Sequence, residues 1–185
     1  MKDMQKAVDR IIAAMQNRER IMVYGDYDVD GTTAVASVFQ FLQQVYESDR
    51  VDYYIPHRYK EGYGVSEAGI DFAIAERFHL LITLDCGIKA QEALGRAKAA
   101  GIDVIVCDHH QPDSNLPDAL ILNPKQIDCT YPFKELSGCG VAFKLLQGLY
   151  HYLNLEQSAL FQILDLVALS IGAYIVELRD ENRTL

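Results

Sequence analysis

Four short apolar segments constrain the fold of this chain more than any other feature of its sequence. Uninterrupted apolar runs are typical of strands that are buried on both faces of a parallel sheet. Helical patterns occupy the sequence between the segments, and this alternation predicts an α/β domain with a doubly wound, mostly parallel sheet flanked by helices. The apolar strands are predicted over residues 21–24, 80–84, 103–107 and 119–122, a further strand over 51–55, and helices over 3–18, 32–46, 66–78, 89–100, 138–152 and 156–172.

Acidic residues follow directly where three of these segments end. Right-handed crossovers keep the carboxyl ends of parallel strands at one edge of a sheet, so these acids are expected to lie close together. Carboxylates in such proximity repel one another, and a bound cation would relieve the repulsion. The sequence therefore predicts a metal centre at this edge. Its candidate ligands are, in chain order, Asp26, Asp28, Asp30, Asp85, Asp108, His109 and His110.

The acidic stretch DYDVDG, residues 26–31, permits two other interpretations. Its spacing resembles the opening of an EF-hand loop, with Gly31 in the sixth position. The twelfth position is Ser37, where an EF-hand needs a bidentate glutamate, and the preceding segment is a predicted strand, so we reject the EF-hand. A solvated acidic turn is the second interpretation. The metal-type residues at two further strand ends argue against it.

Composition excludes some classes of protein. The formal net charge is −9, from 17 basic and 26 acidic residues, which argues against a nucleic-acid binder that works by charge alone. It does not argue against a nuclease whose acids hold cations. The four cysteines show no C-x-x-C spacing, which predicts free thiols in a reducing compartment. The charged N-terminus is not a signal peptide, and residues 166–176 are shorter than the roughly 20 residues that span a bilayer. We therefore expect a cytoplasmic protein without a membrane partner.

Two loops carry candidate substrate-binding residues. The sequence HRYKEGYGVS, residues 57–66, predicts a tight loop around Tyr63 followed by a helix that Ser66 caps. Taken alone, this loop is read as a solvent-exposed basic turn. The sequence SGCG, residues 137–140, offers backbone amides to a phosphate at a helix start. A loop whose glycines simply permit a tight turn is an equally good interpretation.

Together these segments resemble the DHH phosphoesterase superfamily, and within it the bacterial single-strand-specific exonucleases. The resemblance rests on the order and spacing of GDYDVDGTTA, YIPHRYKEGYGVS, LDCGI, VCDHHQP, LNPK, YPFKELSGCGVAFKL, LDLVALSIGA and ENR, which cover nearly the whole chain. It implies a single DHH domain over residues 1–185, without the C-terminal associated domain and nucleic-acid-binding domain of relatives. The implied activity is that of a hydrolase, a phosphodiesterase that uses two Mn²⁺ or Mg²⁺ ions.

The implied substrate is single-stranded DNA, from which nucleotides are removed at the 5′ end in DNA repair and recombination. Replication or recombination proteins are the partners that this role implies. Two alternatives remain open. One is a phosphodiesterase that acts on oligoribonucleotides or cyclic dinucleotides, and the other is a catalytically impaired scaffold.

The resemblance also assigns roles to individual residues. Asp28, with help from Asp26, would hold one ion. Asp30 and His109 would hold the second ion, and Asp85 would bridge the two. Asp108 would orient the histidines, and His110 would face the scissile phosphate. The implied substrate contacts are Arg58, Tyr63, Lys125, Ser137, Gly138 and Gly140, and Tyr24 stands where some relatives place a liganding histidine.

Tyr174 departs from the pattern of the superfamily, which ordinarily carries an aspartate at this position. A phenol with an unperturbed pKa near 10 is a poor ligand for these ions. The departure predicts either a weak second ion, a substitute ligand such as Asp165, or loss of catalysis. Tyr174 is the feature that keeps the scaffold alternative open.

Overall fold

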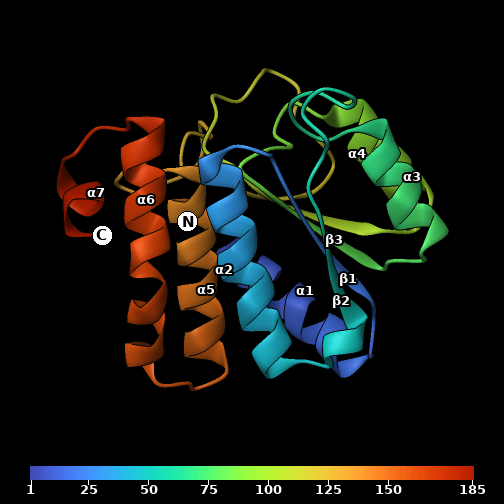
Figure 1. Cartoon of the computed structure of the whole chain (residues 1–185), viewed down its shortest axis with the longest axis horizontal. Helices are drawn as coiled ribbons and strands as arrows, with labels where there is room; N and C mark the ends of the chain where they lie inside the picture. The colour runs from blue at the N-terminus through green and yellow to red at the C-terminus, as the bar shows by residue number, and fades with distance from the viewer.

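A single parallel sheet forms the centre of the computed structural model, which describes all 185 residues (Figure 1). Its strand order is β2-β1-β3-β4-β5, and every neighbouring pair runs parallel. The predicted doubly wound α/β fold is therefore confirmed, and the carboxyl ends of all the strands lie at one edge. The strands are β1 (Ile21–Gly25), β2 (Val51–Tyr54), β3 (Leu80–Leu84), β4 (Asp103–Cys107) and β5 (Leu120–Leu122).

Helices cover both faces of the sheet (Figure 1). Side chains alternate along each strand, so Val23 enters a core cluster of 32 residues on one face. Met22 and Tyr24 enter a cluster of 15 residues on the other face. This burial on both sides explains the apolar runs of the sequence. The larger cluster lies under α1 (Met4–Gln16), α2 (Val29–Val45), α5 (Gly138–Tyr152) and α6 (Leu164–Tyr174), and the smaller under α3 (Glu67–Ala75) and α4 (Gln91–Ala99).

The first turn of α2 begins three residues earlier than predicted. Asp28 is the N-cap, and its side chain accepts a hydrogen bond from the Gly31 amide at 2.9 Å. A side-chain cap of this kind allows a helix to begin without a preceding turn. Gly31 is needed for close approach, since a Cβ there would lie 2.5 Å from the backbone oxygen of Asp26. As a result Asp28 precedes the helix, whereas Asp30 lies inside it.

The helix predicted over residues 156–172 is a 3-10 segment, η2 (Gln157–Ile163), followed by α6. By length and composition, residues Gln157–Tyr174 could cross a membrane, which the sequence analysis did not anticipate. Core helices of soluble proteins have the same properties. Here Leu160, Val167 and Ile171 are buried in the larger core cluster, and α6 packs against α2 and α5.

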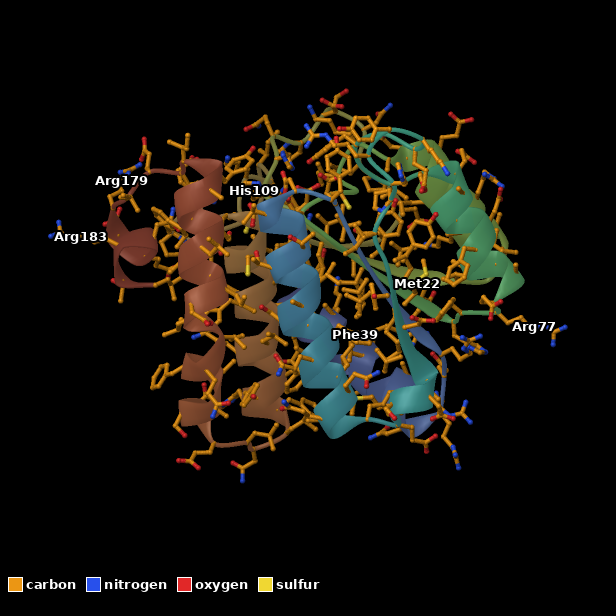
Figure 2. The ribbon with its side chains drawn as sticks, viewed as in Figure 1. Met22, Phe39, Arg77, His109, Arg179 and Arg183 are labelled. Carbon is orange, nitrogen blue, oxygen red and sulfur yellow. The ribbon has the colours of Figure 1, made fainter.

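The C-terminal residues have partners that the sequence did not reveal. A short helix, α7 (Asp180–Thr184), follows α6, and a 3-10 turn, η1 (Ser48–Arg50), precedes β2. Asn182 is buried and donates a hydrogen bond to the carbonyl of Glu135 at 2.6 Å, while Leu185 packs against the larger core cluster. Figure 2 shows Arg179 and Arg183 pointing into solvent from this segment, with His109 near the upper end of α2. All four cysteines are buried free thiols, as predicted.

Candidate metal centre

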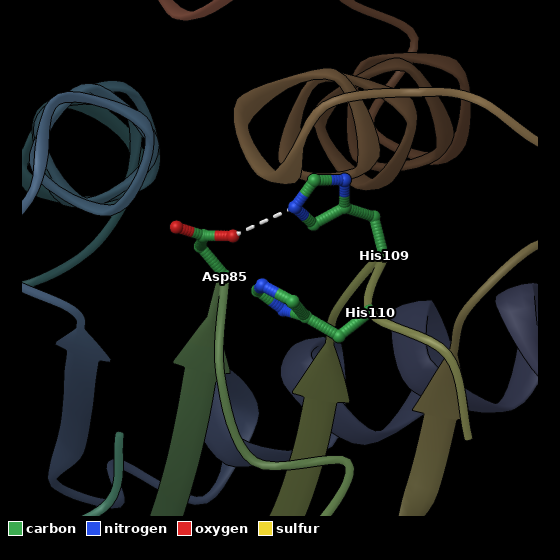
Figure 3. A group of neighbouring side chains, drawn as sticks. All are labelled: Asp85, His109 and His110. Atoms are coloured by element: carbon green, nitrogen blue, oxygen red, sulfur yellow. Dashed lines mark ion pairs between the residues drawn. The ribbon is translucent and has the colours of Figure 1, made fainter. Parts of the chain in front are cut away.

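The loops after β3 and β4 bring Asp85, His109 and His110 together (Figure 3). One potential ligand atom from each residue lies within 4.8 Å of the others. Within this group His109 Nε2 lies 3.1 Å from Asp85 Oδ1. Because β3 and β4 are neighbours in the sheet, their carboxyl ends deliver these side chains to one place. The three side chains therefore converge at the sheet edge, as the positions of the strand ends predicted.

Asp85 occupies a crowded, fully buried position. Neither oxygen of its carboxylate has a hydrogen-bond partner. Its φ of 57° lies in the left-handed region, which costs a non-glycine residue roughly 1–3 kcal/mol. Gly138 packs so closely that a Cβ there would lie 2.5 Å from Asp85 Oδ1. The fold thus holds an uncompensated acid in place at some cost in free energy.

Burial, followed by the charges of Asp30 and Asp28, raises the pKa of Asp85 to about 10. Without a cation Asp85 is therefore protonated at neutral pH. A divalent ion would reverse this preference, because it stabilises the ionised carboxylate and displaces the proton.

His109 and Asp26 add further acceptors without partners. His109 Nδ1 lies 2.8 Å from the carbonyl oxygen of Leu136. Since a carbonyl can only accept, Nδ1 carries the proton, and Nε2 presents a lone pair towards Asp85. Asp26 Oδ1 accepts from the Gly64 amide at 3.2 Å, while burial raises the pKa of Asp26.

The buried atoms that lack hydrogen-bond partners show whether the residues present suit a metal ion. The buried atoms without partners around the centre are Asp26 Oδ2, both oxygens of Asp85 and His109 Nε2. All are acceptors of the carboxylate or imidazole type, which suit Mn²⁺ and Mg²⁺. Half-buried Asp28 adds a carboxylate whose Oδ1 caps α2. The residues present therefore fit divalent cations.

Asp30 differs from the other predicted ligands. Its Oδ1 accepts from the Cys139 amide at 2.6 Å and the Ser170 hydroxyl at 2.7 Å. Its Oδ2 accepts from the Gly138 amide at 2.7 Å and lies 3.6 Å from His109 Nε2. Both oxygens are thus already engaged by the protein.

Asp108 has the contacts of an orienting carboxylate. Its Oδ1 accepts from the amides of His109 and His110 and lies 2.7 Å from His110 Nδ1, while Oδ2 accepts from the Ile88 amide. Burial by itself would raise the pKa of Asp108, but the hydrogen bond and charge of His110 outweigh it, so the pKa is lowered. The ionised carboxylate keeps a proton on His110 Nδ1. His110 Nε2 therefore faces the mouth of the centre.

Arg58 and Tyr63 lie at this mouth. The Tyr63 hydroxyl is 3.1 Å from His110 Nε2, and its ring meets Tyr27 edge-on. The Arg58 guanidinium lies 5.2 Å from the centre of the Tyr27 ring. A cavity of about 360 Å³ is lined by Tyr63, Asp108, His110 and the loop after β3, residues 86–90. Lys125 is further along the sheet edge and pairs with Glu135 at 3.2 Å.

The remaining predicted substrate contacts are buried inside the protein. Gly138 donates its amide to Asp30, and Gly140 donates its amide to Ser137 Oγ at 3.0 Å. Ser137 is the N-cap of α5, and its hydroxyl oxygen lies 2.6 Å from that of Ser170. These contacts support the interpretation in which the glycines permit a tight turn into α5. They leave no free amide for a phosphate at Gly138 or Gly140.

Three further residues concern questions that the sequence left open. Tyr24 points to the opposite face of the sheet and donates its hydroxyl to the Gly64 carbonyl at 2.9 Å, so it does not line the centre. Tyr174 does: its ring centroid is 4.6 Å from that of His109, and its hydroxyl is 3.3 Å from His110 Nε2. Asp165 lies at the other end of α6, about 13 Å away at 1.5 Å per residue. It cannot replace a ligand at position 174.

Two contributors to the centre escaped the sequence analysis. Ser170 sits one helical turn before Tyr174, and this spacing was a signal that both share a face of α6. Leu136 contributes only its backbone carbonyl to His109, and a carbonyl leaves no signal in the sequence.

Comparison with known proteins decides the family. Residues 20–171 match the N-terminal domain of the DHH family. The chain belongs to the DHH family. The single-stranded-DNA-specific exonuclease RecJ of Bacillus subtilis (strain 168) is 47% identical in an alignment of 186 positions that covers 100% of the chain and 23% of that protein. RecJ of Escherichia coli (strain K12) is 39% identical in an alignment of 191 positions that covers 98% of the chain and 33% of that protein.

A solved structure agrees with this relationship. The crystal structure of exonuclease RecJ bound to manganese superposes with a TM-score of 0.89 at 34% identity. The alignment covers 100% of this DHH domain and 46% of that chain. The DHH domain therefore spans less than half the length of these relatives.

Proposed function

We propose that this DHH domain is a metal-dependent phosphodiesterase that removes nucleotides from the 5′ end of single-stranded DNA. The observation that carries the proposal is the set of buried carboxylate and imidazole atoms without partners at one edge of the sheet. The names of the relatives, which are single-stranded-DNA-specific exonucleases, support this substrate, and the manganese-bound RecJ structure supports the ion. The proposed setting is DNA repair and recombination in the cytoplasm.

Two divalent ions would be held by Asp26, Asp28, Asp85 and His109, with Asp85 shared between them. Bound there, Mn²⁺ or Mg²⁺ would activate water and neutralise charge on the phosphodiester. Asp108 fixes the ring of His110, so that Nε2 would face the scissile phosphate. Arg58, at the mouth, would neutralise a neighbouring phosphate.

The proposal is tested with substrates of equal length and a 3′ fluorescent label: single-stranded DNA, the matching duplex, and an oligoribonucleotide. In Mn²⁺ we expect the labelled single strand to shorten from its 5′ end one nucleotide at a time, with the duplex resistant. Asp85→Asn should abolish hydrolysis, whereas Asp49→Asn, which alters an exposed acid in η1, should not. Preferential cleavage of short oligoribonucleotides would favour the small-substrate alternative. Unimpaired hydrolysis by Asp85→Asn would refute the metal centre.

Tyr174 favours a second candidate, an impaired scaffold. Burial, followed by the charge of Asp85, raises the pKa of the Tyr174 phenol, so the group facing the histidines is neutral. A neutral phenol supplies no charge to a second ion. If the chain binds Mn²⁺ without hydrolysing any of the substrates, and Tyr174→Asp gains hydrolysis, the scaffold is the better description.

A further inference from the structure

Asp30 differs from Asp26, Asp28 and Asp85 because both of its carboxylate oxygens accept hydrogen bonds from other elements of the fold. It is 1% exposed and lies in the first turn of α2. Its three hydrogen-bond donors come from α5 and α6, more than 100 residues further along the chain. They are the Gly138 amide at 2.7 Å, the Cys139 amide at 2.6 Å and the Ser170 hydroxyl at 2.7 Å. Among the acids of the cluster only Asp108 has as many partners, and those come from its own loop and from Ile88.

The charge of Asp30 is compensated by the helix that it contacts. The first amides of α5 lack partners within the helix, and the helix dipole places partial positive charge there. Asp30 therefore occupies the position that an external anion would take at this helix start. A carboxylate whose two oxygens already accept three hydrogen bonds has one acceptor position of about four left for another partner.

The contacts of Asp30 place atoms that matter to the ligands. Gly138, which Asp30 holds, packs directly against the Asp85 carboxylate. Leu136, two residues earlier, supplies the carbonyl that fixes His109. Ser170 connects Asp30 to α6, and the last residue of that helix, Tyr174, contacts His109 and His110. Displacing Asp30 would therefore move the surroundings of Asp85 and His109 without removing a ligand.

We propose that Asp30 is a positioning residue that holds α5 and α6 behind the metal centre, rather than a ligand of the second ion. This deepens the proposed function, on which it rests for the identity of the ligands. The ions would then be held by Asp26, Asp28, Asp85 and His109. Asp30, the third acid of the D-x-D-x-D pattern, would stabilise the packing of α2 against α5 and α6 and bind no ion.

The variants Asp30→Asn and Asp85→Asn distinguish a positioning residue from a metal ligand. Asp30→Asn replaces one acceptor oxygen by an amide group that opposes a backbone N–H, so the metal-free melting temperature should fall by several degrees. Its Mn²⁺ stoichiometry should equal that of the parent chain, with Kd within about threefold. Asp85→Asn should weaken Mn²⁺ binding by more than a hundredfold without lowering the metal-free melting temperature. An unchanged melting temperature in Asp30→Asn, with loss of one Mn²⁺ equivalent, would overturn the proposal.

A spectroscopic reading distinguishes positioning from general destabilisation. The ring nitrogens of His109 and the amides of Gly138 and Cys139 are followed by ¹⁵N NMR. We expect all of these signals to shift in Asp30→Asn. Val8→Ala, a buried substitution in α1, should lower the melting temperature without shifting the His109 ring signals. Equal shifts in both variants would overturn the proposal.

Ser170→Ala keeps the test decisive if Asp30→Asn does not fold. It removes one of the three hydrogen bonds to Asp30. A lower melting temperature with parental Mn²⁺ binding supports the positioning role, and an unchanged melting temperature refutes it. If the parent chain binds no Mn²⁺, the proposed function fails, while the melting temperatures and ring signals still decide the role of Asp30.

Discussion

Metal-free protein should lose stability as the pH rises, and Asp85 should be the main cause. The pKa of Asp85 is raised from an ordinary value near 4 to about 10 in the folded chain. The folded state therefore binds a proton that the unfolded state has already released. The stabilisation is complete below the unfolded pKa and is lost as the pH rises towards the folded pKa.

The size of this pH effect follows from the linkage between proton binding and folding. One proton bound only in the folded state changes the free energy of unfolding by about 1.4 kcal/mol per pH unit. Between pH 6 and pH 8 the loss is at most about 2.7 kcal/mol. For a chain of this size that corresponds to a fall in melting temperature of roughly 5–10 °C. Burial also raises the pKa of Asp26, which acts in the same direction.

The assay is urea unfolding of chelator-treated protein at pH 6, 7 and 8, at constant ionic strength. Asp85→Asn removes the titrating group and keeps the shape of the side chain, and asparagine tolerates left-handed backbone angles. Its stability should vary with pH by about 2–3 kcal/mol less than that of the parent over this range. Asp49→Asn serves as the control and should follow the parent. Identical pH dependence in Asp85→Asn and the parent would refute the reasoning.

Three further predictions concern the metal centre. Mn²⁺ binding at pH 8 should release about one proton per chain, measured by calorimetry in buffers of different ionisation enthalpy, and none in Asp85→Asn. Gly138→Ala should weaken Mn²⁺ binding by at least tenfold although it changes no ligand, because the added methyl group displaces Asp85; affinity within twofold of the parent would contradict this. Tyr174→Asp should add one Mn²⁺ equivalent or tighten binding at least tenfold, measured against Tyr174→Phe, whose stoichiometry should equal that of the parent.

The sequence predicted the location of the centre because that location follows from apolar patterning. Strands buried on both faces leave little choice of sheet type, and a parallel sheet brings its carboxyl ends to one edge. Asp85 and His109 could thus be placed together although they follow different strands. The different contacts of Asp28 and Asp30 could not be predicted, since both are aspartates of one short motif. They differ only because one caps α2 and the other lies in its first turn.

Contacts between side chains and backbone groups could not be predicted from the sequence either. The partner of His109 is a carbonyl, and the partners of Asp30 are amides from a distant helix. Every residue carries such groups, so no pattern of side chains distinguishes the ones that are used. The SGCG sequence indicated a helix start, which the structure places at Gly138. It could not show that an acid of the same chain accepts hydrogen bonds from the first amides of that helix.

The close packing of Gly138 bears on how this centre can change by mutation. The position of Asp85 depends on a space beside it that any side chain larger than hydrogen would fill. A saturation library of the domain should therefore tolerate no substitution at position 138, not even the smallest. Gly138, which contributes no ligand, would then be as sensitive to mutation as the ligands themselves. A search for metal ligands based only on intolerance to substitution would therefore count Gly138 as a ligand.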